Sequence, residues 1–127
     1  LSVKQSDIVL NGHAIECRIN AESPETFSPS PGLITRYHPP GGPGVSVDSH
    51  VYTGYKVPPY YDSLIAKFIT HAKTREESLK RMEIALSESM IDGIQTNIPL
   101  QREIVSDQIF LDGPVNIHYL ERKLGLA

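Results

Sequence analysis

The chain has 127 residues, enough for one domain, and its 39% hydrophobic and 21% charged residues are typical of a soluble globular protein. Its net charge of −3 and scattered histidines give no basic stripe, so no nucleic-acid partner is expected. No apolar run approaches the roughly 18 residues of a bilayer span, so no membrane partner is expected either. The single cysteine, Cys17, excludes an intrachain disulfide and a cysteine-rich metal cage, and it fits a reducing compartment.

The segment from Gly12 to Ala21 alternates apolar and polar residues with a period of two, which predicts a half-buried strand. One face carries apolar side chains and the other polar ones: Ile15, Cys17 and Ile19 against Glu16, Arg18 and Asn20. An arginine between a carboxylate and an amide could orient its guanidinium toward an anion or a developing negative oxygen. It could equally be a solvated arginine paired with Glu16, which is commoner on a polar strand face.

Further strands are predicted across the first two-thirds of the chain, separated by loops rich in proline and glycine. The candidates are Leu33 to His38, Val45 to Val51 and Leu64 to Ile69. The last is apolar on nearly both faces, as is typical of a central strand. The segment from Pro39 to Gly44 is the strongest break. We interpret it as a structural turn, because no helix follows it to form a phosphate-binding loop.

The hydrophobic period becomes helical after Thr74. Thr74 to Glu77 is a capping-box pattern. The apolar stripe that follows it ends near Gly93 and predicts a helix near residues 75–91; its members are Leu79, Met82, Leu86 and Met90. Thr96 is predicted to cap a second helix near 97–106, and Asn116 a third near 117–124. Strands followed by helices indicate an α+β fold. Its antiparallel sheet comes mainly from the first two-thirds of the chain, and the helices pack on it.

Other residues that could carry chemistry have simpler structural interpretations. The histidines lack the spacing of metal ligands, so no metal site is predicted. Asp62 is interpreted as a hydrogen-bond anchor for a turn or for a neighbouring cation. Ser63 lacks the glycine-flanked elbow of a nucleophilic serine, and Cys17 is interpreted as a small buried hydrophobe. The residues alone therefore predict an α+β domain with one arginine of interest and no complete catalytic constellation.

Several motifs, in order along essentially the whole chain, resemble the C-terminal domain of biotin carboxylase. They are Gly12 to Glu22, Phe27 to Gly32, Pro58 to Ser63, Asp92 to Asn97 and Asn116 to Leu126. The last is most similar to the bacterial or plastid-type biotin carboxylase subunit of acetyl-CoA carboxylase. The resemblance implies one domain over residues 1–127, preceded in the family by ATP-grasp domains. A start at Leu1, with neither an initiator methionine nor a signal pattern, agrees with a piece of a longer chain.

The resemblance also implies an activity. In the family, ATP and bicarbonate give carboxyphosphate, which carboxylates the ureido N1′ atom of biotin on a carrier protein. The arginine that matches Arg18 holds the ureido oxygen, which becomes negative when N1′ loses its proton. Arg18 is therefore implied as the catalytic residue, with Glu16, Asn20 and Asp62 in support. Ile117 matches an apolar contact near the adenine of ATP, although it could instead be a helix-start residue packed into the core.

The rest of the implied active site lies upstream of this chain. In the family the glycine-rich ATP loop, the acids that bind magnesium or manganese, the bicarbonate-binding arginine and the general base all precede this domain. We therefore expect the isolated chain to lack carboxylase activity. The implied partners are those upstream domains, a biotin carboxyl carrier protein and carboxyltransferase subunits, in the cytoplasm or the plastid stroma.

Two positions depart from the family pattern. Bacterial members usually carry an aromatic residue at the position of Pro43 and an arginine at that of Ser46, and both contribute to the homodimer contact. Because interface energy concentrates in such anchors, we expect a weaker dimer or a monomer. Two other interpretations remain open: a non-catalytic assembly module of the same fold, and the same domain of a pyruvate or propionyl-CoA carboxylase.

Overall fold

The computed structural model describes residues 2–126. Its strands are β1 (His13–Asn20), β2 (Gly32–Leu33), β3 (Arg36–His38), β4 (Val45–Ser49), β5 (Lys56–Val57), β6 (Leu64–Ala72) and β7 (Met90–Asp92). Its helices are the short 3₁₀ helix η1 (Gln5–Asp7) and the α-helices α1 (Arg75–Glu88), α2 (Ile98–Val105), α3 (Gln108–Asp112) and α4 (Tyr119–Lys123). All the strand pairs are antiparallel, so the predicted α+β architecture is confirmed.

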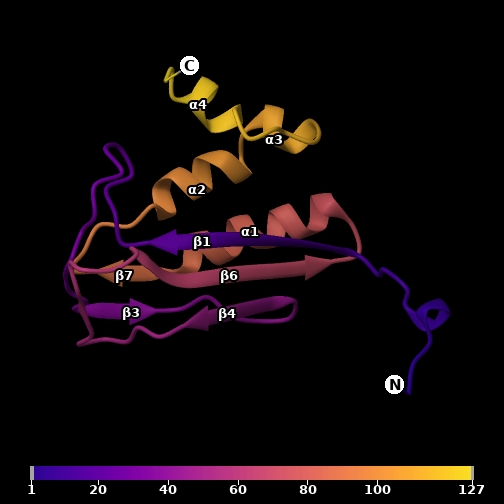
Figure 1. Ribbon diagram of the computed structural model, residues 1–127, viewed down its shortest axis with the longest axis horizontal. Coiled ribbons are helices and arrows are strands. Elements are labelled where there is room, and N and C mark those ends of the chain that lie inside the picture. Colours follow the sequence, from indigo (N-terminus) through magenta and orange to yellow (C-terminus); the bar gives the residue numbers. More distant parts are fainter. Residues whose placement is uncertain (1, 127) are drawn as a thin grey trace.

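Strand β6 lies at the centre of a three-stranded sheet, between β1 and β4 (Figure 1). The prediction of a central strand here is confirmed. Its composition explains the position, because Ile65, Ala66, Phe68, Thr70 and Ala72 are all buried. Strands β1 and β4 are the edges of this sheet. The outward backbone groups of β1 therefore need partners other than a strand.

Helix α1 covers one face of the central sheet and contacts all three of its strands. Leu79, Met82 and Leu86 are buried on its inner face, as their helical spacing predicted. They join Phe68 of β6 and Cys17 of β1 in one hydrophobic core. At the start of the helix, the Thr74 hydroxyl accepts a hydrogen bond from the Glu77 N–H at 3.2 Å, so the predicted N-cap is confirmed.

Helix α1 is shorter than predicted. It ends at Glu88, because Ser89 takes an extended conformation and leads into β7, which pairs with β3. The prediction that Met90 continues the apolar stripe of the helix is wrong, since Met90 lies in β7 and is 45% exposed. Gly93 follows β7 instead of ending the helix. Its φ is +96°, and a Cβ there would lie 2.1 Å from the Leu33 carbonyl oxygen. Gly93 is therefore required by the close packing of the segment after β7 against β2 and not by the end of α1.

The predicted strand from Leu33 to His38 is two strands with different partners. β2 pairs with β5, whereas β3 pairs with β7. Ile34 lies between them, is fully buried, and donates its N–H to the Tyr55 carbonyl at 2.9 Å. The next strand, β4, ends at Ser49 instead of Val51. There the Ser49 hydroxyl donates to the Ile65 carbonyl at 3.0 Å and accepts a hydrogen bond from the Val51 N–H at 3.2 Å.

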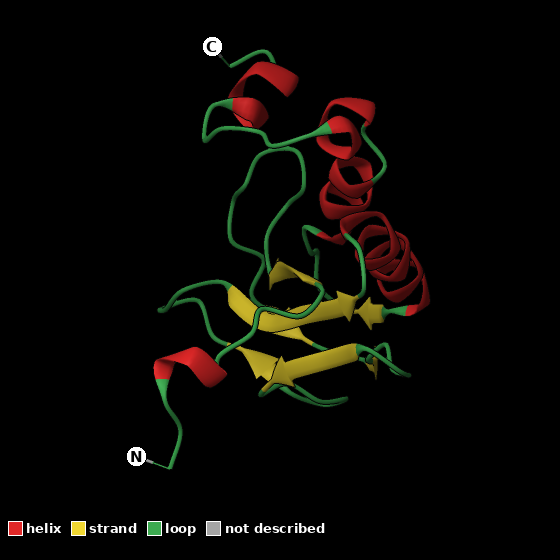
Figure 2. Cartoon of the chain, turned by 90° about the vertical axis from the view of Figure 1, so that its right-hand side faces the viewer, coloured by secondary structure: helices red, strands yellow, loops and turns green. Residues whose placement is uncertain are grey.

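The C-terminal helices lie progressively further from the sheet (Figure 2). α2 packs on α1 and β1, and its N-cap is Asn97 instead of the predicted Thr96. α3, which the sequence pattern did not predict, is capped by Asp107. α4 follows His118, two residues after the predicted cap Asn116, and its Tyr119 ring packs 5.9 Å from that of Phe110. The third predicted helix therefore packs on α3 instead of directly on the sheet.

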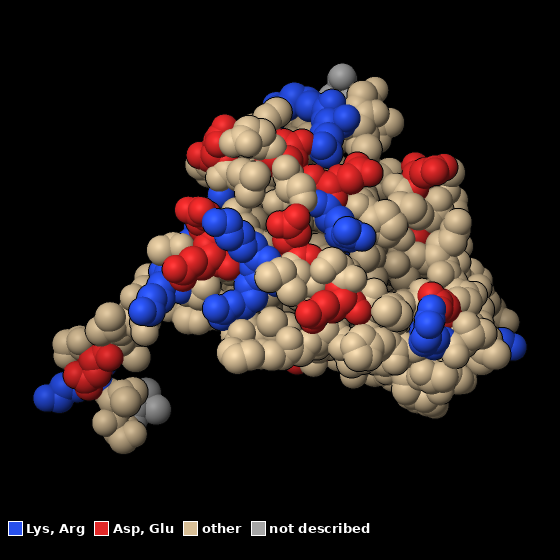
Figure 3. All heavy atoms as spheres, turned by 180° about the vertical axis from the view of Figure 1, so that it is seen from behind, with Lys and Arg blue, Asp and Glu red and all other residues tan. Residues whose placement is uncertain are grey.

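The residues before β1 form an arm that projects from the body of the protein (Figure 3). Its apolar side chains are exposed, including Val9 at 80% and Leu10 at 96%. The His71 ring holds the end of the arm through the Asn11 carbonyl, at 2.8 Å. On the face of the body seen in Figure 3, acidic and basic side chains are intermingled.

Candidate functional site

Arg18 lies on the face of the central sheet that α1 does not cover. Residues that pair directly across antiparallel strands share a face, and successive residues alternate between faces. The register therefore places two neighbouring rows on this face: Arg18, Lys67 and Asp48 in one, and Glu16, Ile69 and Ser46 in the other. We call these two rows the open face. The predicted alternation along β1 is confirmed, since Cys17 and Ile19 are buried on the opposite side.

The Arg18 guanidinium is available to a ligand. Its side chain is 56% exposed, and its ion-pair partner is Glu16, with 3.9 Å between Nη1 and Oε1. An exposed pair at such a distance contributes about 0–1 kcal/mol, so Glu16 does not hold the guanidinium firmly. Directly across the strands lies a second cation, Lys67. Like charges in that position repel, and an oxygen that becomes negative between them would relieve the repulsion.

Asn20 is tied into the end of β1 instead of pointing its amide at Arg18. Its Nδ2 atom lies 3.4 Å from Glu22 Oε1, and Glu22 Oε2 accepts a hydrogen bond from the Ser63 hydroxyl at 3.2 Å. The backbone repeats the connection, because the Ala21 N–H donates to the Ser63 carbonyl at 2.7 Å. Asn20 and Glu22 therefore join the end of β1 to the loop that precedes β6.

Asp62 anchors that loop. Its Oδ1 accepts a hydrogen bond from the Leu64 N–H at 3.2 Å, so its interpretation as a turn anchor is confirmed. Among residues 2–126, no ion pair joins Asp62 to Arg18. Asp62 does share a hollow of about 400 Å³ with Asp48 and Lys67, which belong to the row of Arg18. The hollow brings its carboxylate beside the open face.

Cys17 is buried behind Arg18, on the core side of β1. Burial raises the pKa of its thiol from 9.0 to about 12, and the nearby Glu16 carboxylate contributes to the shift. A thiol with such a pKa stays protonated at neutral pH and is a poor nucleophile. The interpretation of Cys17 as a buried hydrophobe is confirmed.

This shift predicts a loss of stability at alkaline pH. The unfolded thiol loses its proton near 9.0 and the folded one near 12, so the unfolded state binds fewer protons between these values. The free energy of unfolding should therefore fall by about 1.4 kcal/mol per pH unit in that window, and the variant Cys17→Ala should lack this loss. Urea unfolding of both chains at pH 8 and pH 10.5 measures the difference. Equal losses in the two chains would contradict the prediction.

Ile117 lies in the segment before α4, and its side chain is 88% exposed. This exposure excludes the alternative that it packs into the core. The preceding Asn116 fixes the segment, because its Oδ1 accepts hydrogen bonds from the His118 N–H at 3.1 Å and from Arg122 Nη2 at 3.0 Å. An apolar side chain is thereby held in solvent, in a position to meet an apolar ligand surface.

The two positions expected to depart from the family pattern lie in the open face or in the turn next to it. Ser46 belongs to one of its rows, and Pro43 lies in the turn just before β4. Both residues are exposed. The structure therefore places Ser46 one row away from Arg18, so that a partner covering Ser46 would approach the arginine.

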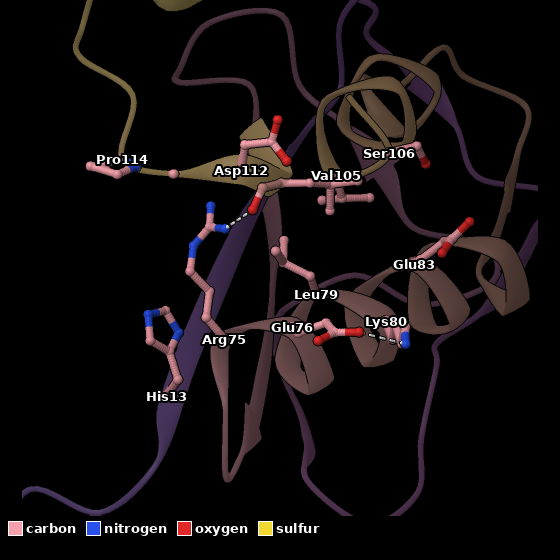
Figure 4. Close-up of a pocket in the computed structure, with 12 residues that line it drawn as sticks. His13, Arg75, Glu76, Leu79, Lys80, Glu83, Val105, Ser106, Asp112 and Pro114 are labelled. Atoms are coloured by element: carbon pink, nitrogen blue, oxygen red, sulfur yellow. Dashed lines mark hydrogen bonds and ion pairs between the residues drawn. The ribbon is translucent and has the colours of Figure 1, made fainter. Parts of the chain in front are cut away.

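A larger cavity than the hollow beside Asp62 lies on the helical side of the protein. It measures about 860 Å³, and its lining comes from the start of β1, from α1 and from the segment between α2 and Pro114 (Figure 4). At its edge the Arg75 guanidinium donates to the Leu111 carbonyl at 2.8 Å and packs 5.2 Å from the Phe110 ring centre. Arg75 is thus engaged in holding α3 against α1.

The described residues offer neither a metal cluster nor a helical membrane span. Residues 2–126 contain no group of three or more histidine, cysteine, aspartate or glutamate side chains that could hold a metal ion. In the same part of the chain, no helix has both the length and the apolar character needed to cross a membrane.

Sequence patterns missed three residues around Arg18. Lys67 lies in a strand with a largely apolar sequence, and only the register shows that it pairs directly with Arg18. Asn97 and Gln101 lie about 80 residues further along the chain, yet both donate to the Arg18 carbonyl. Nothing local in the sequence signals such a contact. The Asp92 to Asn97 motif marked the segment without indicating what it touches.

Comparison with known proteins identifies the family. The model of the biotin carboxylase C-terminal domain matches residues 16–122. Over 126 residues the chain is 61% identical to the biotin carboxylase of Haemophilus influenzae, a match that covers 99% of this chain and 28% of that protein. It is 48% identical over 122 residues to a pyruvate carboxylase subunit of Methanothermobacter thermautotrophicus, a match that covers 95% of this chain and 25% of that protein.

A solved structure agrees with these matches. It is the biotin carboxylase domain dimer of the Hydrogenobacter thermophilus 2-oxoglutarate carboxylase, in complex with MgADP, ADP and bicarbonate. The TM-score is 0.93 at 48% identity, covering 96% of this chain and 27% of that one. The chain thus spans less than a third of the length of the relatives it matches. It belongs to the biotin carboxylase C-terminal domain family.

Proposed function

We propose that this chain is the C-terminal part of an ATP-dependent biotin carboxylase and that its open face completes the biotin site. The observation that carries the proposal is Arg18. Its guanidinium is more than half exposed, only loosely paired, and faced by Lys67 on an uncovered sheet face. Because the chain belongs to the biotin carboxylase family, we infer that the ligand of this face is biotin.

The chemistry requires a fixed positive charge at one atom. When a base removes the N1′ proton, the electron pair spreads onto the ureido oxygen, and N1′ then attacks the carboxyl carbon of the activated bicarbonate while phosphate leaves. The Arg18 guanidinium would stabilise the negative oxygen, as donors do in an oxyanion hole. Arginine suits this task because its planar fork stays charged at any physiological pH. Lys67 would add to the positive potential at the same oxygen.

The other groups of the reaction belong to the upstream part of such an enzyme. We infer that ATP, its magnesium or manganese ions, bicarbonate and the general base are all held there. The complete activity is therefore proposed for the full-length protein and not for this chain alone.

For the wider assembly, we propose the bacterial or plastid-type acetyl-CoA carboxylase. The biotin would be carried by a biotin carboxyl carrier protein and the product used by carboxyltransferase subunits, in the cytoplasm or the plastid stroma. Support comes from the Asn116 to Leu126 motif and from the 61% identity to the biotin carboxylase of Haemophilus influenzae. The 48% identity to a pyruvate carboxylase subunit makes a pyruvate carboxylase the second candidate.

We propose that Ile117 contacts the adenine of ATP. The prediction is that Ile117→Ala in the full-length enzyme raises the KM for ATP about three- to thirtyfold, through the loss of a few apolar carbon contacts. Stability should not change, since the side chain is 88% exposed. Steady-state kinetics against ATP measures the effect. The matched control is Ile109→Ala, an exposed isoleucine on α3, and an equal rise in KM for both variants would contradict the assignment.

The proposed function is tested by comparing the isolated chain with the full-length protein. The full-length protein should release phosphate from ATP in a reaction that requires bicarbonate, and it should carboxylate free biotin. The isolated chain should do neither. Activity in the isolated chain would contradict the proposal that the rest of the active site lies in the upstream part of the enzyme. A full-length protein that carboxylates no biotin would favour a non-catalytic assembly module.

A further inference from the structure

Asn97 replaces a missing strand partner beside Arg18. Strand β1 is an edge of the central sheet, and at residues 18 and 20 three of its outward backbone groups bond to Asn97. The Asn97 amide group donates to the Arg18 carbonyl at 3.0 Å and accepts from the Asn20 N–H at 2.9 Å. The Asn97 backbone N–H donates to the Asn20 carbonyl at 3.2 Å. One residue therefore satisfies three groups that an edge strand leaves open.

These bonds lie where β1 is irregular. The pairing of β1 with β6 shifts register between Ile19 and Asn20. Such a shift bends a strand and re-aims the side chains next to it. Because Arg18 lies one residue before the shift, the direction of its side chain depends on how the backbone of residues 18–20 is held. β6 fixes one edge of this segment, and Asn97 fixes the other.

The loop that carries Asn97 is itself firmly placed. Gly93 packs against the Leu33 backbone so closely that a side chain would not fit. Two residues later, the Gln95 N–H donates to the Ser30 hydroxyl at 2.9 Å. Asn97 is only 5% exposed and begins helix α2. One turn into that helix, Gln101 adds a second donor to the Arg18 carbonyl, with its Nε2 at 3.3 Å.

We propose that Asn97, assisted by Gln101, is a positioning residue for the biotin-site arginine. Asn97 does not touch the substrate. It holds the Arg18 backbone so that the guanidinium meets the ureido oxygen without rearrangement. The inference rests on the proposed function of Arg18, and it assigns to the start of α2 a role in the carboxyl-transfer step. Stabilisation of a developing charge depends on such pre-organisation.

The test measures two rates in the full-length enzyme: bicarbonate-dependent ATP cleavage without biotin, and carboxylation of free biotin. In Asn97→Ala, kcat for biotin carboxylation should fall about ten- to a hundredfold, since a displacement near 1 Å has effects of this size. Bicarbonate-dependent ATP cleavage should stay within about twofold of wild type, because Arg18 acts only on biotin. Gln101→Ala, a change at a half-exposed position, should lower carboxylation about two- to fivefold, with the same selectivity.

Ser78→Ala is the matched control for stability. It removes a buried hydroxyl that donates to the Thr70 carbonyl at 3.2 Å between α1 and β6, on the face away from Arg18. Its melting temperature should fall while the ratio of the two rates stays at the wild-type value. If Asn97→Ala does not fold, Gln101→Ala and Gln101→Glu decide the question, because each removes a donor to the Arg18 carbonyl at a half-exposed position.

The variant Arg18→Ala separates the positioning role of Asn97 from the proposed function of Arg18. Selective loss of carboxylation in Arg18→Ala, Asn97→Ala and Gln101→Ala supports the positioning role. Loss in Arg18→Ala alone, or an equal loss of both rates in the Asn97 and Gln101 variants, overturns the positioning role and leaves the proposed function standing. Unchanged carboxylation in Arg18→Ala overturns the proposed function, and the positioning role with it.

Discussion

Replacing Arg18 by alanine in the full-length enzyme should lower kcat for biotin carboxylation about a hundred- to a thousandfold, the effect of removing one pre-organised donor from a developing oxyanion. Bicarbonate-dependent ATP cleavage should persist, because that step precedes any charge on biotin. The fold should also persist, since the Arg18 side chain is 56% exposed and its pair with Glu16 is long at 3.9 Å. The measurement is the ratio of carboxybiotin formed to ATP cleaved.

Two further variants sharpen this prediction. Arg18→Lys keeps a positive charge but loses the planar fork, so it should recover only a small part of the lost rate. Arg36→Ala is the matched control, because Arg36 is also an exposed strand arginine with one acidic partner, Asp92, at 2.6 Å. Arg36 lies on β3, outside the open face, and its removal should leave the ratio unchanged. A normal ratio in Arg18→Ala would contradict the assignment of Arg18.

The second large effect concerns dimerisation. The double variant Pro43→Phe and Ser46→Arg should strengthen self-association of the full-length protein about 30-fold or more, because each restored anchor can contribute roughly 1–2 kcal/mol or above. Both positions are exposed, and Ser46 lies on the open face, so larger side chains there would meet a partner and not the core. Sedimentation equilibrium at nanomolar to micromolar concentration measures the dissociation constant.

The control for this prediction is Ser87→Arg, which places the same side chain on the exposed surface of α1. It should leave the dissociation constant unchanged. A wild-type protein that is already a tight dimer at nanomolar concentration would contradict the expectation that Pro43 and Ser46 weaken the contact. The solved biotin carboxylase domain of Hydrogenobacter thermophilus is a dimer.

Local periodicity predicted the elements whose burial is one-sided. The alternation around Cys17 and Arg18 assigned both faces of β1 correctly, because one face packs into the core beneath α1 and the other carries the exposed side chains of Glu16 and Arg18. The stripe of Leu79, Met82 and Leu86 likewise predicted the inner face of α1. In both elements a single surface is buried. Apolar residues therefore recur along the sequence with the period at which side chains return to one face of a strand or a helix.

Long-range contacts decided the parts that periodicity missed. Ile34 is buried between β2 and β3, and this interrupts what seemed to be one strand. Gly93 suggested the end of a helix, whereas its positive φ serves a close approach to Leu33. Asn97 seemed an ordinary residue near a helix start, yet its partners lie in β1. No local pattern encodes a partner so distant in sequence.

The central claim is that Arg18 and the open face bind the ureido group of biotin, and its most direct test is a structure of the full-length protein with ADP, bicarbonate and biotin. The account predicts that the ureido oxygen lies about 2.7–3.1 Å from the Arg18 guanidinium nitrogens, with the Arg18 carbonyl still bonded to Asn97. A biotin whose ureido oxygen faces another group, while Arg18 remains beside Glu16, would contradict it.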